Sequence, residues 1–249
     1  MRPQLMKPKR AMVLAAGLGL RMRPLTDEMP KPLIQAGGRT MLDRVLDRLE
    51  AFGIEQVVVN SHYLPDRIAA HLAARGSPKT VLSPEPALLD TGGGVAKALA
   101  ELGDEPFWAI NADIVWLDGP IPALDRLAAA WDDGAMDALL LMHRTVTAYG
   151  YTGRGDYNMD PHGGLRRRDP RDVSPYAFTG LQLLHKRLFG GAPDGPFSLN
   201  LLYDRAEHGR RLFGLVHDGE WFHVGTPDAL KIADDRLFGR PGAHDFHVG

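Results

Sequence analysis

The stretch VLAAGLGLRMRP, from Val13 to Pro24, joins an apolar segment to a glycine turn and then to two cations. The residues from Met12 to Ala15 have the continuous apolar character of a short buried strand. A glycine turn leaves backbone N–H groups exposed, and Arg21 and Arg23 add positive charge beside them. The stretch therefore predicts a phosphate-binding turn that follows a strand.

Two familiar phosphate-binding loops do not fit this turn. A dinucleotide fingerprint that starts at Gly17 would need a third glycine where Met22 stands, and the Gly-Lys-Ser/Thr of a Walker loop is absent. Lys31 lies between two prolines, which stiffen its backbone. Fixed Arg21 and Lys31 side chains above exposed N–H groups suit a triphosphate, whereas a plain surface loop with solvated charges is the alternative.

The rest of the first half alternates between apolar runs and helical spacing. Strands are expected at 12–15, 56–60, 80–83, 107–111 and 138–142, and helices at 41–52, 65–74, 95–102 and 121–131. This alternation predicts an α/β fold with a Rossmann-like, mixed and mostly parallel sheet and helices on both faces. Ligands bind beyond the carboxyl ends of such strands, where Gly17, residues 83–94 and residues 111–113 all fall.

The chain of 249 residues is expected to form a single domain, 1–249, with two parts, about 10–145 and about 146–238. In the second part, residues 149–180 are rich in glycine, proline and aspartate and predict turns or hairpins. A strand is expected at 180–184, and helices at 199–209 and 227–239. Residues 239–249 are expected to form a loose tail.

Composition narrows the possible partners and the compartment. A formal net charge of −2 gives no general basic field, so no nucleic acid partner is expected. The absence of cysteine excludes disulfides and thiol catalysis and favours a cytoplasmic location. The apolar run at 11–20 is too short for a membrane helix, and arginines rather than a cleavage site follow it, so no membrane partner or secretion signal is expected. These features leave the oligomeric state open.

The segment LAAGLGLRMRPLT…MPKPL resembles the signature of the sugar-1-phosphate nucleotidyltransferases. Further matches are LDTGGG (89–94), NAD (111–113), FTGLQLL (178–184) and WFHVGTPDAL (221–230). The resemblance implies a Rossmann-like core that joins a nucleoside triphosphate to a sugar 1-phosphate and releases pyrophosphate.

Within this family, the compact N-acetylmuramate-1-phosphate uridylyltransferases resemble the chain in length, in TGGG and in GRGD. UTP and N-acetylmuramate 1-phosphate are therefore the favoured substrates, with a role in nucleotide-sugar biosynthesis and cell-wall recycling. A mannose-1-phosphate guanylyltransferase, a cytidylyltransferase of the same fold, and a non-catalytic nucleotide-sensing domain are the alternatives.

The resemblance also implies functional residues. Arg21, Lys31 and Asp113 correspond to catalytic positions. The implied nucleotide-binding residues are Ala15, Ala16, Gly17, Gly19, Arg21, Lys31, Asp90, Gly92, Gly93 and Asn111, and the implied sugar-binding residues are Asp156, Thr179 and Gly180. For the three glycines at 92–94 a helix entry without ligand is the alternative, and for Asp113 a cap or turn.

The implied cofactor is Mg²⁺, bound by Asp113 and by the residue at position 223. Many relatives have aspartate where this chain has His223. Imidazole is a better ligand for Mn²⁺ or Co²⁺ than for Mg²⁺, so these ions are expected to be tolerated, and a purely structural histidine is the alternative. The lysine that holds the sugar phosphate in longer relatives is missing, and Arg166, Arg167 and Arg168 are the candidates to replace it.

Overall fold

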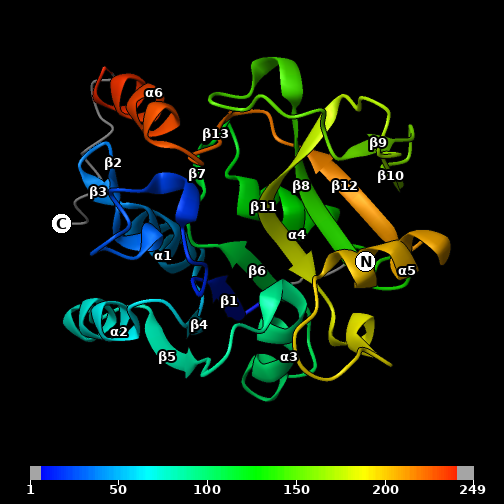
Figure 1. Cartoon of the computed structure of the whole chain (residues 1–249). Coiled ribbons are helices and arrows are strands. Elements are labelled where there is room, and N and C mark those ends of the chain that lie inside the picture. Colours follow the sequence, from blue (N-terminus) through cyan, green and yellow to red (C-terminus); the bar gives the residue numbers. More distant parts are fainter. Residues whose placement is uncertain (1–6, 240–249) are drawn as a thin grey trace.

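The computed structural model describes residues 7–239 and contains one sheet of nine strands (Figure 1). Seven strands form a continuous order: β10 (Leu165–Arg167), β9 (Tyr157–Met159), β11 (Tyr176–Leu184), β6 (Phe107–Asn111), β1 (Arg10–Leu14), β4 (Gln56–Ser61) and β5 (Lys79–Pro84). The other two are β8 (Ala138–Arg144), which pairs with β11, and β12 (Leu212–Val216), which pairs with β8. The sheet thus includes strands from both parts of the chain.

Parallel pairing is concentrated in the first half of the chain. Strand β1 pairs in parallel with β4 and β6, and β4 pairs in parallel with β5. Strand β11 runs antiparallel to both β6 and β8 and joins the two halves of the sheet. The predicted mixed sheet is confirmed, and its parallel strands all send their carboxyl ends to the edge where the glycine turn lies.

Helices cover both faces of the sheet, as predicted (Figure 1). One face contacts α1 (Met41–Phe52), α2 (Pro65–Ala74) and α4 (Ala123–Ala130), and the other contacts α3 (Asp90–Leu102) and α5 (Asn200–His208). Alternate residues of β1 serve the two cores: Ala11 and Val13 face the first, and Met12 faces the second. This alternation explains why the strand is apolar throughout.

Several elements differ from the prediction. Helix α3 begins at Asp90 rather than at Val95, so the three glycines lie inside its first turns. Strand β11 begins at Tyr176 and is longer than expected. Strands β9 and β10 form an antiparallel hairpin within residues 149–180, where turns or hairpins were expected, whereas β12 was not predicted. Helix α4 is shorter than the predicted 121–131. The expected tail lies, apart from Gly239, outside the described residues.

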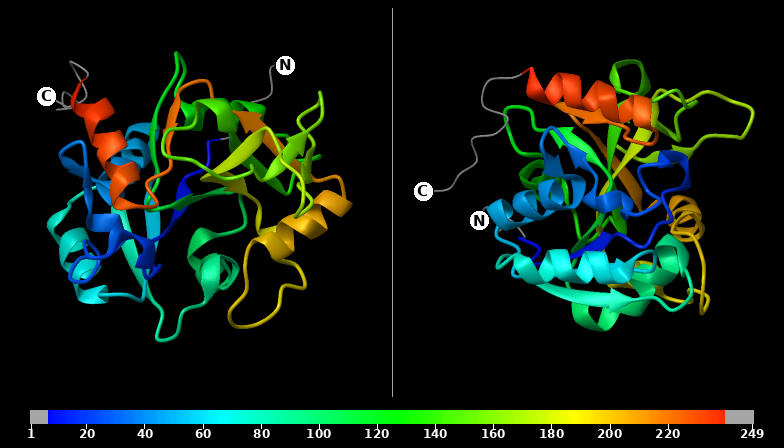
Figure 2. Two further views of the ribbon diagram at one scale, coloured as in Figure 1. Left: turned by 45° about the horizontal axis from the view of Figure 1, so that its top comes forward. Right: turned by 60° about the vertical axis from the view of Figure 1, so that its left-hand side comes forward.

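Two small sheets and the carboxyl-terminal helix lie beside the main sheet. Strand β7 (Val115–Leu117) pairs with β13 (Glu220–Phe222), and β2 (Gln35–Ala36) pairs with β3 (Arg39–Thr40). Helix α6 (Pro227–Phe238), in red, lies beside the blue amino-terminal elements in Figures 1 and 2. The Asp234 carboxylate accepts a hydrogen bond from the Gly37 backbone N–H at 2.6 Å. This hydrogen bond joins α6 to the turn between β2 and β3.

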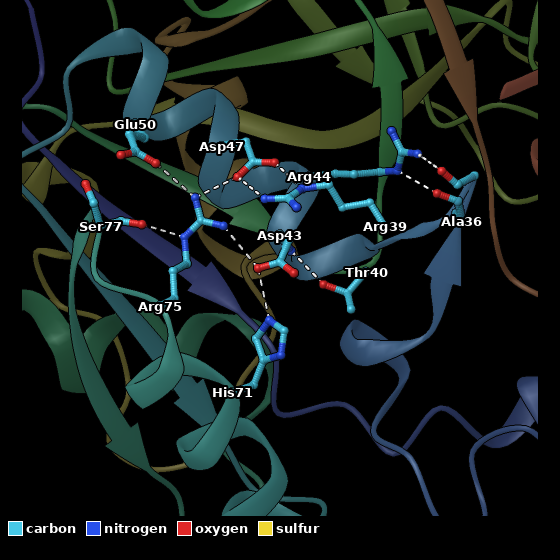
Figure 3. Close-up of polar contacts among 11 residues, drawn as sticks. Ala36, Arg39, Thr40, Asp43, Arg44, Asp47, Glu50, His71, Arg75 and Ser77 are labelled. Atoms are coloured by element: carbon cyan, nitrogen blue, oxygen red, sulfur yellow. Dashed lines mark hydrogen bonds and ion pairs between the residues drawn. The ribbon is translucent and has the colours of Figure 1, made fainter. Parts of the chain in front are cut away.

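A cluster of charged side chains joins α1 to α2 (Figure 3). Arg75, at the end of α2, pairs with Asp43, Asp47 and Glu50, which follow the helical spacing along α1. His71 adds a contact to Asp43 at 2.9 Å. Hydrogen bonds from His71, Thr40 and Arg75 outweigh the burial that opposes them, and the pKa of Asp43 is lowered. The cluster holds α2 against α1 on the face away from α3.

Candidate active site

A cavity with a volume of about 490 Å³ opens at the carboxyl ends of β1, β4 and β6. Its lining includes Asp113, which was expected to bind metal, and eight of the ten residues expected to bind nucleotide: Ala15, Ala16, Gly17, Gly19, Arg21, Lys31, Asp90 and Asn111. Residues that were not anticipated complete the wall: Leu14, Leu20, Met22, Pro32, Asn60, Leu88, Thr91 and Gly225. The structure thus brings most of the predicted nucleotide-binding residues into one concave site.

The glycine turn forms one wall of this cavity. Gly19 has φ of 64°, and a Cβ there would lie 2.9 Å from the Thr26 methyl, so the turn itself requires glycine. A Cβ at Gly17, by contrast, would meet no protein atom within 4 Å. Glycine at position 17 therefore leaves open space next to the backbone, as a ligand that approaches the N–H groups requires. Arg21 follows in a short 3-10 helix, Leu20–Met22.

Lys31 and Asp113 meet across the cavity. The Lys31 ammonium nitrogen lies 2.6 Å from the Asp113 carboxylate, and the two side chains are 12% and 36% exposed. Lys31 begins a second short 3-10 helix after Pro30, and Asp113 follows β6. The pair places one positive and one negative charge side by side in the cavity.

A buried hydrogen-bond chain behind the cavity was missed by sequence reasoning. The Asn60 side-chain oxygen accepts from the Ala15 backbone N–H at 2.7 Å, and its amide donates to Glu85 at 2.6 Å. The second Glu85 oxygen accepts from the Leu89 backbone N–H at 3.0 Å. Glu85 is only 4% exposed. These hydrogen bonds connect the glycine turn to the loop before α3. The sequence signal for them was Asn60, a polar residue directly after the apolar run 57–59.

The glycines of α3 serve close packing rather than the cavity wall. A Cβ at Gly92 would lie 2.3 Å from the Phe197 ring, and one at Gly93 would lie 2.4 Å from the Gly195 carbonyl oxygen. The Gly92 and Gly93 N–H groups both donate to the Phe197 carbonyl. The structure therefore does not bring these two candidates to the cavity, and it explains their residue type by contact with the segment before α5.

His223 lies close to Asp113 because of strand register. In the antiparallel pair of β13 and β7, Phe222 is opposite Val115. His223 follows Phe222 and Asp113 shortly precedes Val115, so both residues lie at the same end of this small sheet. Burial lowers the pKa of His223, and the nearby Lys31 and Arg21 cations lower it further. The imidazole is consequently neutral and able to act as a metal or hydrogen-bond partner.

Of the three expected sugar-binding residues, Asp156 and Gly180 lie near His223 or the cavity wall, whereas the Thr179 side chain does not. Asp156 accepts a hydrogen bond from the Phe178 backbone N–H at 2.8 Å, and its charge acts on His223. Gly180 has φ of 91°, and a Cβ there would lie 2.8 Å from the Asn111 amide, so this glycine lies against the cavity wall. Thr179 is 2% exposed, and its hydroxyl donates to the Leu141 carbonyl. Its side chain anchors β11 to β8 and does not face the cavity.

Two of the three arginines at 166–168 are already occupied. Arg167 pairs with Asp204 at 2.7 Å. Arg168 donates to the carbonyl oxygens of Gly155, Asp169, Pro170 and Asp172, so it holds a loop together. These two side chains are therefore committed to structure, and of the three candidates Arg166 keeps an exposed side chain.

The fold and the family of the chain follow from comparison with known proteins. Residues 11–162 match the MobA-like NTP transferase domain. The structure resembles the inositol-1-phosphate CTP transferase of T. maritima with a TM-score of 0.75 and 16% identity, over 96% of this chain and 100% of that one. The chain belongs to the MobA-like NTP transferase family, and it is a nucleotidyltransferase.

Two curated relatives narrow the comparison further. The chain is 41% identical to the N-acetylmuramate alpha-1-phosphate uridylyltransferase of Caulobacter vibrioides, over 92% of this chain and 97% of that protein. It is 33% identical to the protein of that name from Neisseria meningitidis serogroup B, over 90% of this chain and 96% of that protein. These matches confirm the resemblance read from the motifs. No helix within residues 7–239 has the length and apolar character needed to cross a bilayer.

Proposed function

We propose that this protein transfers a uridylyl group from UTP to N-acetylmuramate 1-phosphate and releases pyrophosphate. The observation that carries the proposal is the near full-length similarity to the Caulobacter vibrioides relative, together with a cavity lined by the glycine turn, Arg21, Lys31 and Asp113. This set supplies backbone N–H groups and two cations for a triphosphate.

In the proposed reaction an oxygen of the sugar phosphate attacks the α-phosphorus of UTP in line, and the bond to the leaving pyrophosphate breaks. Arg21 neutralises charge on the β- and γ-phosphates, and Lys31 does so near the reacting centre. No covalent enzyme intermediate is needed, because positioning and charge neutralisation lower the barrier. Lys31 is held in place by Asp113 before substrate arrives.

A divalent metal ion, Mg²⁺, belongs to the same proposal. Within residues 7–239 no three metal-ligating side chains gather into a ready-made metal site. The proposed donors are the Asp113 carboxylate, which lines the cavity, and the neutral His223 imidazole, which lies near Asp113. They fit an ion that takes its remaining ligands from phosphates and water, as Mg²⁺ does, and that neutralises phosphate charge when bound. Mn²⁺ and Co²⁺ are expected to substitute because of the imidazole.

The acceptor is proposed to lie on the far side of His223 from the glycine turn. Asp156 and the backbone around Gly180 are its proposed contacts. Gly180 supports this placement because it lies against Asn111, which lines the nucleotide cavity. The acceptor would thus enter beside the α-phosphate.

The test is a matrix of the four nucleoside triphosphates against sugar 1-phosphates, with Mg²⁺, read as pyrophosphate release. UTP with N-acetylmuramate 1-phosphate should give the highest kcat/KM. A higher value for GTP with mannose 1-phosphate would favour the guanylyltransferase alternative. No pyrophosphate from any pair would favour a nucleotide-sensing domain. The cytoplasmic location expected from the sequence is part of the proposal, and cell fractionation tests it.

A further inference from the structure

Hydrogen bonds hold the carboxyl end of the loop from Gly150 to Asp156, around Arg154 and Gly155. Ser174 N–H donates to the Arg154 carbonyl at 2.7 Å, and Gly155 N–H donates to the Tyr151 hydroxyl at 3.0 Å. The Arg168 guanidinium donates to the Gly155 carbonyl at 2.9 Å. Gly155 has φ of 76°, and a Cβ there would lie 2.1 Å from the Ser174 carbonyl oxygen. No larger residue fits at that position, so the close contact with Ser174 requires glycine.

This loop lies against His223. The Tyr149 carbonyl accepts from the His223 backbone N–H at 2.8 Å, and the Tyr151 ring meets the His223 ring edge-on with centroids 5.6 Å apart. A Cβ at Gly150 would lie 2.9 Å from the His223 carbonyl oxygen. The loop therefore lies beside His223, on the side proposed for the acceptor.

Arg154 is the cation that this loop presents. Its side chain is exposed and, among residues 7–239, makes no hydrogen bond or ion pair. Two other arginines of this part of the chain do have partners: Arg168 donates hydrogen bonds to the loop carbonyls, and Arg167 pairs with Asp204. A structure that holds the backbone at an arginine but leaves the guanidinium unpaired is suited to bind an anion from solution.

We propose that Arg154 binds an anionic oxygen group of the acceptor sugar. The inference rests on the proposed function, because N-acetylmuramate 1-phosphate carries two such groups, the carboxylate of its ring substituent and the phosphate. A guanidinium binds either one through two parallel hydrogen bonds. Because the backbone of the loop is already ordered, only the side chain has to be immobilised on binding. Arg154 thus determines acceptor affinity.

The test compares Arg154→Ala and Arg154→Lys with Arg67→Ala as the matched control. Arg67 is also exposed and unpaired within residues 7–239, but it lies on α2, which contributes no residue to the cavity. Each variant is assayed at saturating UTP with N-acetylmuramate 1-phosphate and with N-acetylglucosamine 1-phosphate, which lacks the carboxylate. Loss of a charge-assisted bidentate contact should lower kcat/KM of Arg154→Ala by about 10- to 100-fold. Arg154→Lys should recover part of the loss, and Arg67→Ala should match the wild type.

The two acceptors identify the group that is bound. A loss with the muramate substrate alone supports binding of the carboxylate, and an equal loss with both supports binding of the phosphate. Arg154→Ala activity within about twofold of the wild type on both acceptors, or an equal loss in Arg67→Ala, overturns the inference. Turnover of neither acceptor by the wild type refutes the proposed function instead. Calorimetric binding of the two acceptors then decides about Arg154: weaker binding by Arg154→Ala supports the inference, and equal or absent binding overturns it.

Discussion

Glu85→Gln should weaken both folding and nucleotide binding, although it removes no heavy atom. Both Glu85 oxygens accept hydrogen bonds, one from the Asn60 amide and one from the Leu89 N–H. Glutamine has a single side-chain oxygen, so its NH₂ group would face one of these two donors. Turning the Asn60 amide over does not help, because its oxygen would then no longer accept from the Ala15 N–H. One donor must lose its partner.

The magnitude follows from burial. Glu85 is 4% exposed and Asn60 is 2% exposed, so water does not readily replace the lost partner. An unsatisfied buried donor costs about 1–3 kcal/mol, which is the expected loss in the free energy of unfolding for Glu85→Gln. Glu85→Ala leaves both donors without an acceptor and should lose about 2–6 kcal/mol. The affinity for UTP should fall too, because Ala15 lines the cavity and its N–H is held by this chain.

Urea unfolding measures the stability of each variant, and a UTP titration measures its affinity. Glu105→Gln is the control, since Glu105 is exposed and the same change of charge should leave stability within about 0.5 kcal/mol of the wild type. Glu85→Gln as stable as that control would refute the reasoning. So would a destabilised variant whose UTP affinity at low temperature, where it is fully folded, equals that of the wild type.

Four further predictions concern the cavity and the buried histidines. Arg21→Ala and Lys31→Ala should each lower turnover by about 10²- to 10³-fold with an unchanged melting temperature; near-normal pyrophosphate release would contradict the phosphate-binding assignment. In thermal-shift titrations with Mg²⁺, UTP should stabilise the protein more than GTP, CTP or ATP does, by about 2.7 kcal/mol at 100 times its Kd. Asp113→Asn should abolish metal-dependent turnover, His223→Asp should retain or improve activity with Mg²⁺, and His223→Ala should lose less than Asp113→Asn; equal activity of Asp113→Asn and wild type would exclude the metal assignment. Burial lowers the pKa of His217, so at acidic pH the unfolded chain takes up a proton that the folded one does not, and stability should fall as the pH drops below about 6.5. In urea unfolding at several pH values, His217→Gln should flatten this dependence, and an unchanged slope would argue against the prediction.

The local features of the sequence determined the first half of the fold and most of the nucleotide cavity. Helix α2 begins and ends at the predicted residues, and α1 begins after the predicted Thr40 cap, whose hydroxyl accepts from the Asp43 N–H at 3.0 Å. Apolar runs, caps and glycine turns act over a few neighbouring residues, so they can be read directly from the chain. The glycine turn and Lys31 both line the cavity, and both could be predicted because each one follows from such a local signal.

Only the tertiary structure decided which distant residues meet. The register of β13 against β7 brings His223 to the end of the sheet where Asp113 lies, and a shift by one residue would turn it to the other face. The roles of Gly92 and Gly93 were likewise set by a segment far along the chain, since Phe197 lies where a Gly92 side chain would be and the Gly195 carbonyl where a Gly93 side chain would be. Residue type shows that a close approach is possible, but the partner depends on long-range packing, which local periodicity does not encode.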